Sequence, residues 1–187
     1  MKKVLSLLFV LNMFSSSYGQ SINSLCEFGF DDRGLFSKQD VENDYVIYEI
    51  PQMSASDLKA ATISAISSLF KSPKDVVTNL GDNIIQLERY APHVYSTITE
   101  GSRRDVYYND ISYSLIIQFK DGKIRYNTPS VRQIWLTEVP MIGNLKLDMS
   151  KPLASLVKGS YDRDQVVKEF NTMIKSINEM VKKANDW

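Results

Sequence analysis

The stretch Ile111 to Asn127 reads ISYSLIIQFKDGKIRYN and is the part of the sequence that determines the fold. From Ile111 to Phe119 every odd-numbered position is apolar, and most even-numbered positions between them are polar. Alternation with a period of two is typical of a β-strand with one buried face. Asp121-Gly122 marks a hairpin turn, after which Ile124 and Tyr126 continue the alternation. The stretch therefore predicts an antiparallel hairpin with one apolar face.

The sequence before this hairpin predicts more strands and a helix. Runs rich in β-branched and aromatic residues favour strands at 45–50, 76–80 and 84–90. Between the first two runs, residues 55–71 carry apolar side chains at helical spacing. Ser54 precedes this helix, and serine is a preferred residue at a helix N-terminus. Residues 91–109 have no clear periodicity, so their pairing is left open.

The sequence after the hairpin predicts a connection and then a second long helix. We expect residues 130–161 to form the connection, which is too long to lack structure in a compact domain. Residues 162–185 carry an apolar stripe at helical spacing, which predicts the C-terminal helix. Residues 20–43 are acidic and contain glycines that interrupt any period, so we expect a loosely structured lead-in there.

The predicted elements give a single α+β domain over residues 44–187, with its sheet core at 44–129. Their order is strand, helix, four strands in hairpins, and helix. Strands that are segregated from two amphipathic helices indicate an antiparallel sheet covered on one face. We therefore expect about five antiparallel strands, with the two main helices packed on one face of the sheet.

The first nineteen residues have the layout of a secretory signal peptide. Two lysines are followed by an apolar run from Val4 to Phe14, and small residues stand at Ser17 and Gly19. This layout predicts cleavage after Gly19. A membrane anchor is the alternative, but a span needs about 20 apolar residues and this run is shorter. A lipoprotein is disfavoured because Leu25, before Cys26, is not the small residue that lipid attachment requires.

We therefore expect the protein to be exported to the periplasm or outside the cell, with no membrane span in the mature chain. The full chain has 22 basic and 22 acidic residues, and the signal peptide contains two of the lysines and no acid. The mature chain is therefore slightly acidic, which argues against nucleic acid as a partner because phosphate binding needs clustered cations. One His and one Cys exclude a multi-Cys or multi-His zinc site in a single chain.

No catalytic, cofactor-binding or metal-binding residue can be assigned from the sequence. The only histidine, His93, and the only cysteine, Cys26, are far apart in the chain, and no motif relates them. A nucleophile needs an adjacent base to be activated. A small periplasmic hydrolase that uses paired carboxylates is the alternative, since such enzymes need no histidine. The sequence favours a binding or interaction module over an enzyme.

The order of motifs resembles a family of exported Bacteroidetes proteins described as a domain of unknown function with a TBP-like fold. The similarity lies in an apolar strand that ends at Pro51, a Ser-capped helix that ends in Leu69-Phe70-Lys71, and a short Val-rich strand before a Gly turn. The alternating strand that runs into Asp121 to Tyr126 completes it. The resemblance covers about residues 44–130. It implies a TBP-like βαββββα arrangement and no particular activity.

The predicted sheet face away from the helices is the candidate interaction surface. Alternation places Ile116 and Gln118 on that face, with Lys123 and Arg125 across the hairpin turn. Tyr107-Tyr108 is a candidate aromatic contact for an envelope protein or a glycan. The alternative is that these polar residues only meet water, as one face of an antiparallel sheet often does.

Overall fold

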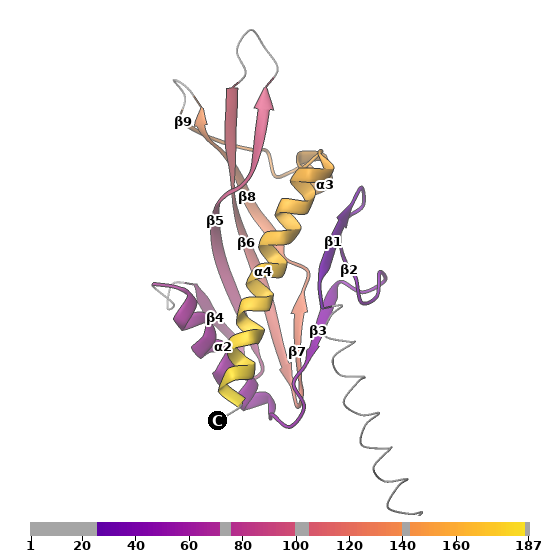
Figure 1. Cartoon of the computed structure of the whole chain (residues 1–187), viewed down its shortest axis with the longest axis vertical. Helices are drawn as coiled ribbons and strands as arrows, with labels where there is room; N and C mark the ends of the chain where they lie inside the picture. Colours follow the sequence, from indigo (N-terminus) through magenta and orange to yellow (C-terminus); the bar gives the residue numbers. More distant parts are fainter. Residues whose placement is uncertain (1–25, 72–75, 100–104, 140–142, 186–187) are drawn as a thin grey trace, which may run out of the picture.

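The computed structural model describes residues 26–71, 76–99, 105–139 and 143–185 (Figure 1). The expected signal peptide lies outside the described residues. The strands are β1 (Phe28–Asp31), β2 (Gly34–Ser37), β3 (Tyr45–Glu49), β4 (Val77–Gly81), β5 (Ile84–Thr99), β6 (Asp105–Lys120), β7 (Lys123–Asn127), β8 (Ser130–Val139) and β9 (Gly143–Lys146). The helices are α2 (Ala55–Leu69), α3 (Leu153–Leu156) and α4 (Ser160–Asn185). None of the helices in these ranges is both long and apolar enough to cross a membrane.

The main sheet is antiparallel and has seven strands, so the expected class is confirmed and the expected count of about five is too low. Its order is β3-β7-β6-β5-β4, and β8 pairs with both β6 and β9. The two additional strands, β8 and β9, come from residues 130–161, which the sequence predicts only as a connection. The strands β1 and β2 form a separate two-stranded hairpin.

The strand β6 organises the sheet because it is long enough to pair with two strands along one edge. It has 16 residues, and one edge pairs with β5 from end to end. Along its other edge, residues 117–120 pair with β7 and residues 108–114 pair with β8. Within the unassigned segment 91–109, the described residues belong to the end of β5, up to Thr99, and to the start of β6, from Asp105.

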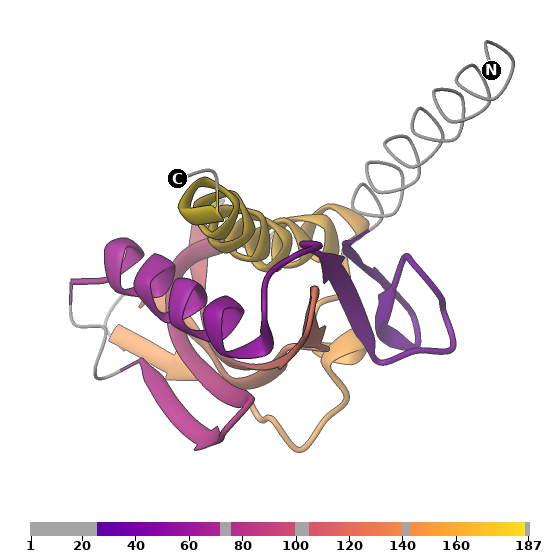
Figure 2. The same cartoon turned by 90° about the horizontal axis from the view of Figure 1, so that it is seen from below.

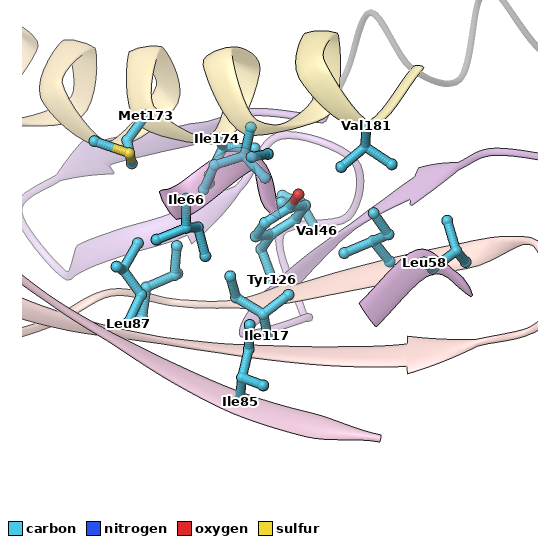
Figure 3. Packing of buried hydrophobic residues seen from close by; sticks show 14 of the residues in the cluster. Val46, Leu58, Ile66, Ile85, Leu87, Ile117, Tyr126, Met173, Ile174 and Val181 are labelled. Atoms are coloured by element: carbon cyan, nitrogen blue, oxygen red, sulfur yellow. The ribbon is translucent and has the colours of Figure 1, made fainter. Parts of the chain in front are cut away.

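The apolar face of the predicted hairpin is buried under the helices, as expected. All five odd-numbered residues from Ile111 to Phe119 are buried, together with Ile124 and Tyr126. Figure 2 shows α2 and α4 on the same side of the curved sheet. Figure 3 shows side chains of α4, such as Ile174 and Val181, pointing towards this core.

The core consists of two clusters along the sheet, and α4 spans both. The lower cluster joins α2 and the C-terminal part of α4 to β3, β5, β6 and β7. The upper cluster includes Val166 and Phe170 of α4, packed with Ile111 and Tyr113 of β6. Because it contributes to both clusters, α4 holds the long sheet together along its length.

The hairpin turn also fixes the start of α2. Ser54 is the N-cap, and its hydroxyl accepts a hydrogen bond from the Asp57 backbone N–H at 3.2 Å. The Asp121 carboxylate in the β6–β7 turn accepts a second one, from the Ala55 N–H at 2.9 Å. Gly122 follows with a φ of 73°, which glycine adopts without steric cost. The turn that sets the register of the hairpin therefore also caps the helix.

The lead-in over residues 20–43 is not loosely structured in its described part, because residues 28–37 form the β1–β2 hairpin. Phe28 is fully buried, and Phe36 lies against Gly29, where a Cβ atom would come within 2.4 Å of the ring. Gly29 therefore provides room for an aromatic ring and does not mark a break in the strand. Gly34, with a φ of 121°, provides the turn.

Candidate functional site

The structure places four predicted residues together on the open face, which we define as the side of the main sheet opposite α2 and α4. Gln118 pairs with Arg125 of β7 on one side and with Ile84 of β5 on the other. Ile116 is two residues along the same strand, and Lys123 is two residues before Arg125. Their side chains are partly or fully exposed, whereas their odd-numbered neighbours on β6 are buried. The assignment of the two sheet faces from alternation is therefore confirmed.

The cations of this surface are paired with acids from β3 and the loop before it. The Lys123 ammonium lies 2.9 Å from the Glu49 carboxylate, and the Arg125 guanidinium lies 3.6 Å from the Asp44 carboxylate. The Arg125 guanidinium also lies 3.7 Å from the centre of the Tyr45 ring. Exposed ion pairs of this kind contribute about 0–1 kcal/mol. They balance the charge of the face, so this half is not a strongly cationic surface.

The two predicted tyrosines do not share a face. Successive residues of a strand point to opposite sides of the sheet. Tyr108 has the parity of Ile116 and lies on the open face, where 37% of its surface is exposed. Tyr107 has the parity of the buried residues and belongs to the other side, so it is not part of the open face. Tyr108 and Gln118 are ten residues apart, which corresponds to about 33 Å along a strand.

Tyr108 instead belongs to a group of four rings, which we call the aromatic patch: Tyr90, His93, Tyr108 and Trp135. Tyr90, Tyr108 and Trp135 lie on the open face, and His93, in the bulge of β5, also lines a small hollow with residues of α4. The Tyr90 and Trp135 rings meet edge to face with centres 5.5 Å apart. The His93 and Tyr108 ring centres are 4.6 Å apart. Tyr90 is 54% exposed. Exposed aromatic side chains that lie close together are unusual on a monomer surface and mark contact sites.

The aromatic patch is held in place by Asp110, which is buried beneath it. The Tyr90 hydroxyl donates to Asp110 Oδ2, and the His93 backbone N–H donates to Asp110 Oδ1 at 2.8 Å. The hydrogen bond to Asp110 is the main cause of the raised pKa of the Tyr90 phenol, followed by burial. A single carboxylate therefore orients one ring of the patch and the backbone that carries another.

A β-bulge brings these groups together. The pairing of β5 with β6 shifts between Ala91 and Tyr95, where Asp110 stands opposite the extra residues. Pro92 in this segment has no N–H to offer the ladder. His93 adopts a φ of 53°, a conformation in which histidine is enriched among non-glycine residues. Bulges often re-aim side chains next to functional sites.

Sequence reasoning missed three of the four rings in the patch. Tyr90 and His93 come from β5 and Trp135 from β8, so only the sheet pairing brings them to Asp110 of β6. The one local signal was Pro92 inside a β-rich run, which indicates a bulge. No local signal joins Trp135 to Tyr90, because β8 lies in the stretch that the sequence predicts as a connection.

Two further reactive side chains, Cys26 and Glu169, are held in the fold by burial or by hydrogen bonds. Burial raises the pKa of the Cys26 thiol to about 12, and the charge of Glu27 adds to this effect. Glu169 accepts from Arg89 Nε at 2.5 Å and from the Tyr113 hydroxyl at 3.2 Å. Among the residues in the described ranges, no three His, Cys, Asp or Glu side chains are grouped so that they could hold a metal ion.

Two solved structures are similar to this chain. A DUF4468 family protein from Bacteroides ovatus ATCC 8483 is 13% identical with a TM-score of 0.43, and the match covers 73% of this chain and 84% of that chain. A TBP-like protein from Parabacteroides distasonis ATCC 8503 is 11% identical with a TM-score of 0.48, and the match covers 74% of this chain and 90% of that chain. Both descriptions agree with the resemblance seen in the sequence. No protein-family model and no curated protein matches the chain.

Proposed function

We propose that the protein is a non-enzymatic binding module of the cell envelope and that its contact surface is the open face centred on the aromatic patch. The partner is an envelope protein or a glycan. Both kinds of partner are bound by exposed aromatic rings that are fixed in orientation, because such rings provide large contact area at a low cost in conformational entropy.

The observation that carries this proposal is the exposure of Tyr90 and Tyr108 above a buried carboxylate. Two exposed aromatic rings on one face leave apolar surface in contact with water in the free protein. Burying these rings in a complex would remove that surface from water, which is favourable. The Asp110 hydrogen bonds orient the patch before a partner arrives. Preorganisation of this kind reduces the entropy lost on binding.

A hydrolase that uses carboxylates receives less support from the same side chains. A carboxylate pair in a glycosidase needs one acid and one base that both face the substrate. Asp110 and Glu169 are the most enclosed candidates, and each accepts hydrogen bonds from two groups of the fold. These interactions suit carboxylates that position other residues.

Capture experiments with surface variants test the binding proposal. Immobilised protein would be incubated with detergent-solubilised envelope proteins in one arm and with purified envelope polysaccharide in the other. We expect Tyr108→Ser combined with Trp135→Ser to abolish capture in one arm. Tyr161→Ser is the matched control, because Tyr161 is 66% exposed on α4 and lies outside the patch. Equal capture by the wild type and the double variant would contradict the proposal.

A second comparison decides which half of the open face is used. Lys123→Glu with Arg125→Glu reverses the paired cations and should leave the melting temperature nearly unchanged, because both pairs are exposed. If this variant loses capture and the aromatic variant retains it, the contact surface is the charged half of the face and our assignment to the aromatic patch is wrong.

The location of the protein is part of the same proposal and has its own test. We propose that the chain is exported and that the mature form begins at Gln20, because small residues stand at Ser17 and Gly19 after an apolar run. Intact mass spectrometry of the protein from the envelope fraction should give the mass of residues 20–187. A mass that includes residues 1–19, or a lipid on Cys26, would contradict this prediction.

A further inference from the structure

A groove of about 560 Å³ lies between α4, the β1–β2 hairpin and β3, on the helix-bearing side of the sheet. We call it the α4 groove, and it is lined by Cys26, Lys38, Tyr48, Lys168, Lys175 and Asn178, among others. Figure 2 shows the hairpin beside α4, separate from the main sheet. The volume is within the range of about 300–1,000 Å³ that is typical of sites for small ligands.

Asn178 supplies an unsatisfied hydrogen-bonding group at this groove. Its side chain is only 2% exposed, and its Oδ1 atom accepts a hydrogen bond from the Tyr126 hydroxyl at 2.6 Å. Figure 3 shows that the Tyr126 hydroxyl points towards α4. The Nδ2 atom of Asn178 has no hydrogen-bond partner among the described residues. Exchanging the amide oxygen and nitrogen would leave the other end without a partner instead.

This unpartnered amide is costly for the free protein. A buried donor without an acceptor costs about 1–3 kcal/mol, and such groups are rare in native structures. A leucine at this position would remove the unpartnered donor but would leave the buried Tyr126 hydroxyl without its acceptor. A ligand with an acceptor oxygen would satisfy the donor and keep the Tyr126 hydrogen bond. The amide therefore points to a ligand that accepts a hydrogen bond deep in the groove.

The groove also offers two lysines from one face of α4. Asp164, Lys168, Asn171, Lys175 and Asn178 follow one another at spacings of four and three residues, which places them in one stripe. Lys168 has no ion-pair partner among the described residues. Lys175 has one, Glu179, at 3.9 Å, and both side chains are exposed, so this pair is weak.

The remaining charges of the groove do not cancel these lysines. Lys38 is paired with Glu27 at 2.7 Å. Within the lining, Asp164 is then the one remaining acid beside Lys168 and Lys175, so the lining keeps a net positive charge, and Glu179 contacts Lys175 from outside the lining. An anion is favoured at the level of the two lysines, and a neutral acceptor is favoured at Asn178.

We propose that the α4 groove binds a small molecule that carries a carboxylate and an amide carbonyl, such as an N-acylated amino acid or the C-terminal end of a short peptide. The carboxylate would lie between Lys168 and Lys175. Asn178 Nδ2 is enclosed in the free protein, so the Asn178 side chain would have to shift towards the groove for the ligand carbonyl to accept from it. This site differs from the aromatic patch, whose Tyr90, Tyr108 and Trp135 lie on the open face, although His93 and Lys168 line a smaller hollow in common.

Titration with N-acetylalanine, followed by NMR chemical-shift changes, tests the proposal. We expect saturable binding, and we expect N-acetylalanine amide, which lacks the carboxylate, to bind at least about tenfold more weakly because a charge-assisted contact is lost. Lys168→Gln combined with Lys175→Gln should weaken acid binding by a similar factor. Lys183→Gln is the control, since Lys183 is also exposed on α4 and does not line the groove.

Asn178→Leu tests the buried amide by two readouts. It removes the unpartnered donor, so we expect weaker binding of N-acetylalanine, and it leaves the Tyr126 hydroxyl without its acceptor. We expect a loss of stability no greater than that of Tyr126→Phe, which removes the only hydrogen bond that the Asn178 side chain makes to the described residues. If Asn178→Leu does not fold, the lysine double variant still tests whether the groove binds the carboxylate. Absence of saturable shifts, equal binding of the acid and the amide, or unchanged binding by the lysine double variant would each overturn the proposal.

Discussion

Single side chains complete hydrogen bonding that the strands leave open. The Gln39 side chain pairs with Ile47 of β3, donating to its carbonyl at 2.7 Å and accepting from its N–H at 2.6 Å. The Asn171 side chain of α4 likewise donates to the carbonyl of Phe28 in β1 at 3.0 Å and accepts from the Phe28 N–H at 2.9 Å. Each amide takes the place of a neighbouring strand residue at an edge, which satisfies backbone groups that would otherwise be unpaired.

Asp110→Asn is predicted to loosen the aromatic patch. The substitution replaces a carboxylate, which accepts hydrogen bonds from the Tyr90 hydroxyl and the His93 N–H, with a neutral amide. Hydrogen bonds to charged groups are stronger than those between neutral groups. The pKa of Tyr90 should fall towards its ordinary value, which an ultraviolet absorbance titration measures. A double-mutant cycle with Tyr90→Phe should give a coupling energy of about 1 kcal/mol. Additive effects of the two substitutions would show that the hydrogen bond adds no stability.

Asn171→Ala is predicted to release the β1–β2 hairpin from α4. It leaves the N–H and the carbonyl of Phe28 without partners, which should cost about 1–3 kcal/mol for a partly buried site. Native-state hydrogen exchange should show faster exchange in residues 28–37 and unchanged protection in β6. Unchanged protection of the hairpin would mean that Phe28 packing alone holds it.

At the scale of the elements, α4 contributes most to joining the parts of the fold. Its buried residues begin at Val166 in the upper cluster and end at Val181 in the lower one. The Phe170 ring meets the Tyr113 ring edge to face, with centres 4.7 Å apart. The apolar stripe that the sequence predicts over residues 162–185 is therefore confirmed as a packing face, and the helix begins two residues earlier, at Ser160.

Phe170→Ala is predicted to cost about 3–5 kcal/mol of the free energy of unfolding, because it empties the site of a fully buried ring in the upper cluster. Urea denaturation measures the change. Lys175→Ala on the exposed side of the same helix is the control and should stay within about 0.5 kcal/mol of the wild type. A small effect at Phe170 would mean that the upper cluster contributes little to stability.

At the scale of the whole molecule, buried phenols make stability depend on alkaline pH. Burial raises the pKa values of Tyr95, Tyr113 and Tyr126, and it raises the pKa of Cys26 to about 12. A folded-state pKa above the unfolded value means that the unfolded chain loses its proton first. The stabilisation is therefore complete below the unfolded pKa and is lost as the pH rises above it.

The free energy of unfolding is thus predicted to fall as the pH rises above about 9, the ordinary value for cysteine, and to fall more steeply above about 10, the ordinary value for tyrosine. Chemical denaturation at a series of pH values measures this slope. Cys26→Ala should remove the part of the decline that begins near pH 9. A flat profile up to pH 11 would contradict the burial of these groups.

Much of the fold was predictable because local periodicity reports which face of an element is buried. The alternation from Ile111 to Phe119, the Asp121-Gly122 turn and the stripe of α4 each lie within one element. The β1–β2 hairpin was also encoded locally, in the run from Phe28 to Phe36, but its glycines were taken as breaks. Gly29 accommodates the Phe36 ring, which is a contact across the hairpin and not a local property.

By itself, the sequence determined the α+β class, the two main helices, the central hairpin and the assignment of its two faces, because helical and strand periods depend only on neighbouring residues. Tertiary structure alone decided that Asp110 would meet Tyr90 and Trp135, that Lys123 and Arg125 would be neutralised from β3, and that Asn178 would face a groove. These contacts join residues from different elements. They depend on strand register and on helix docking, and a shift of one residue in register would send each side chain to the opposite face of the sheet.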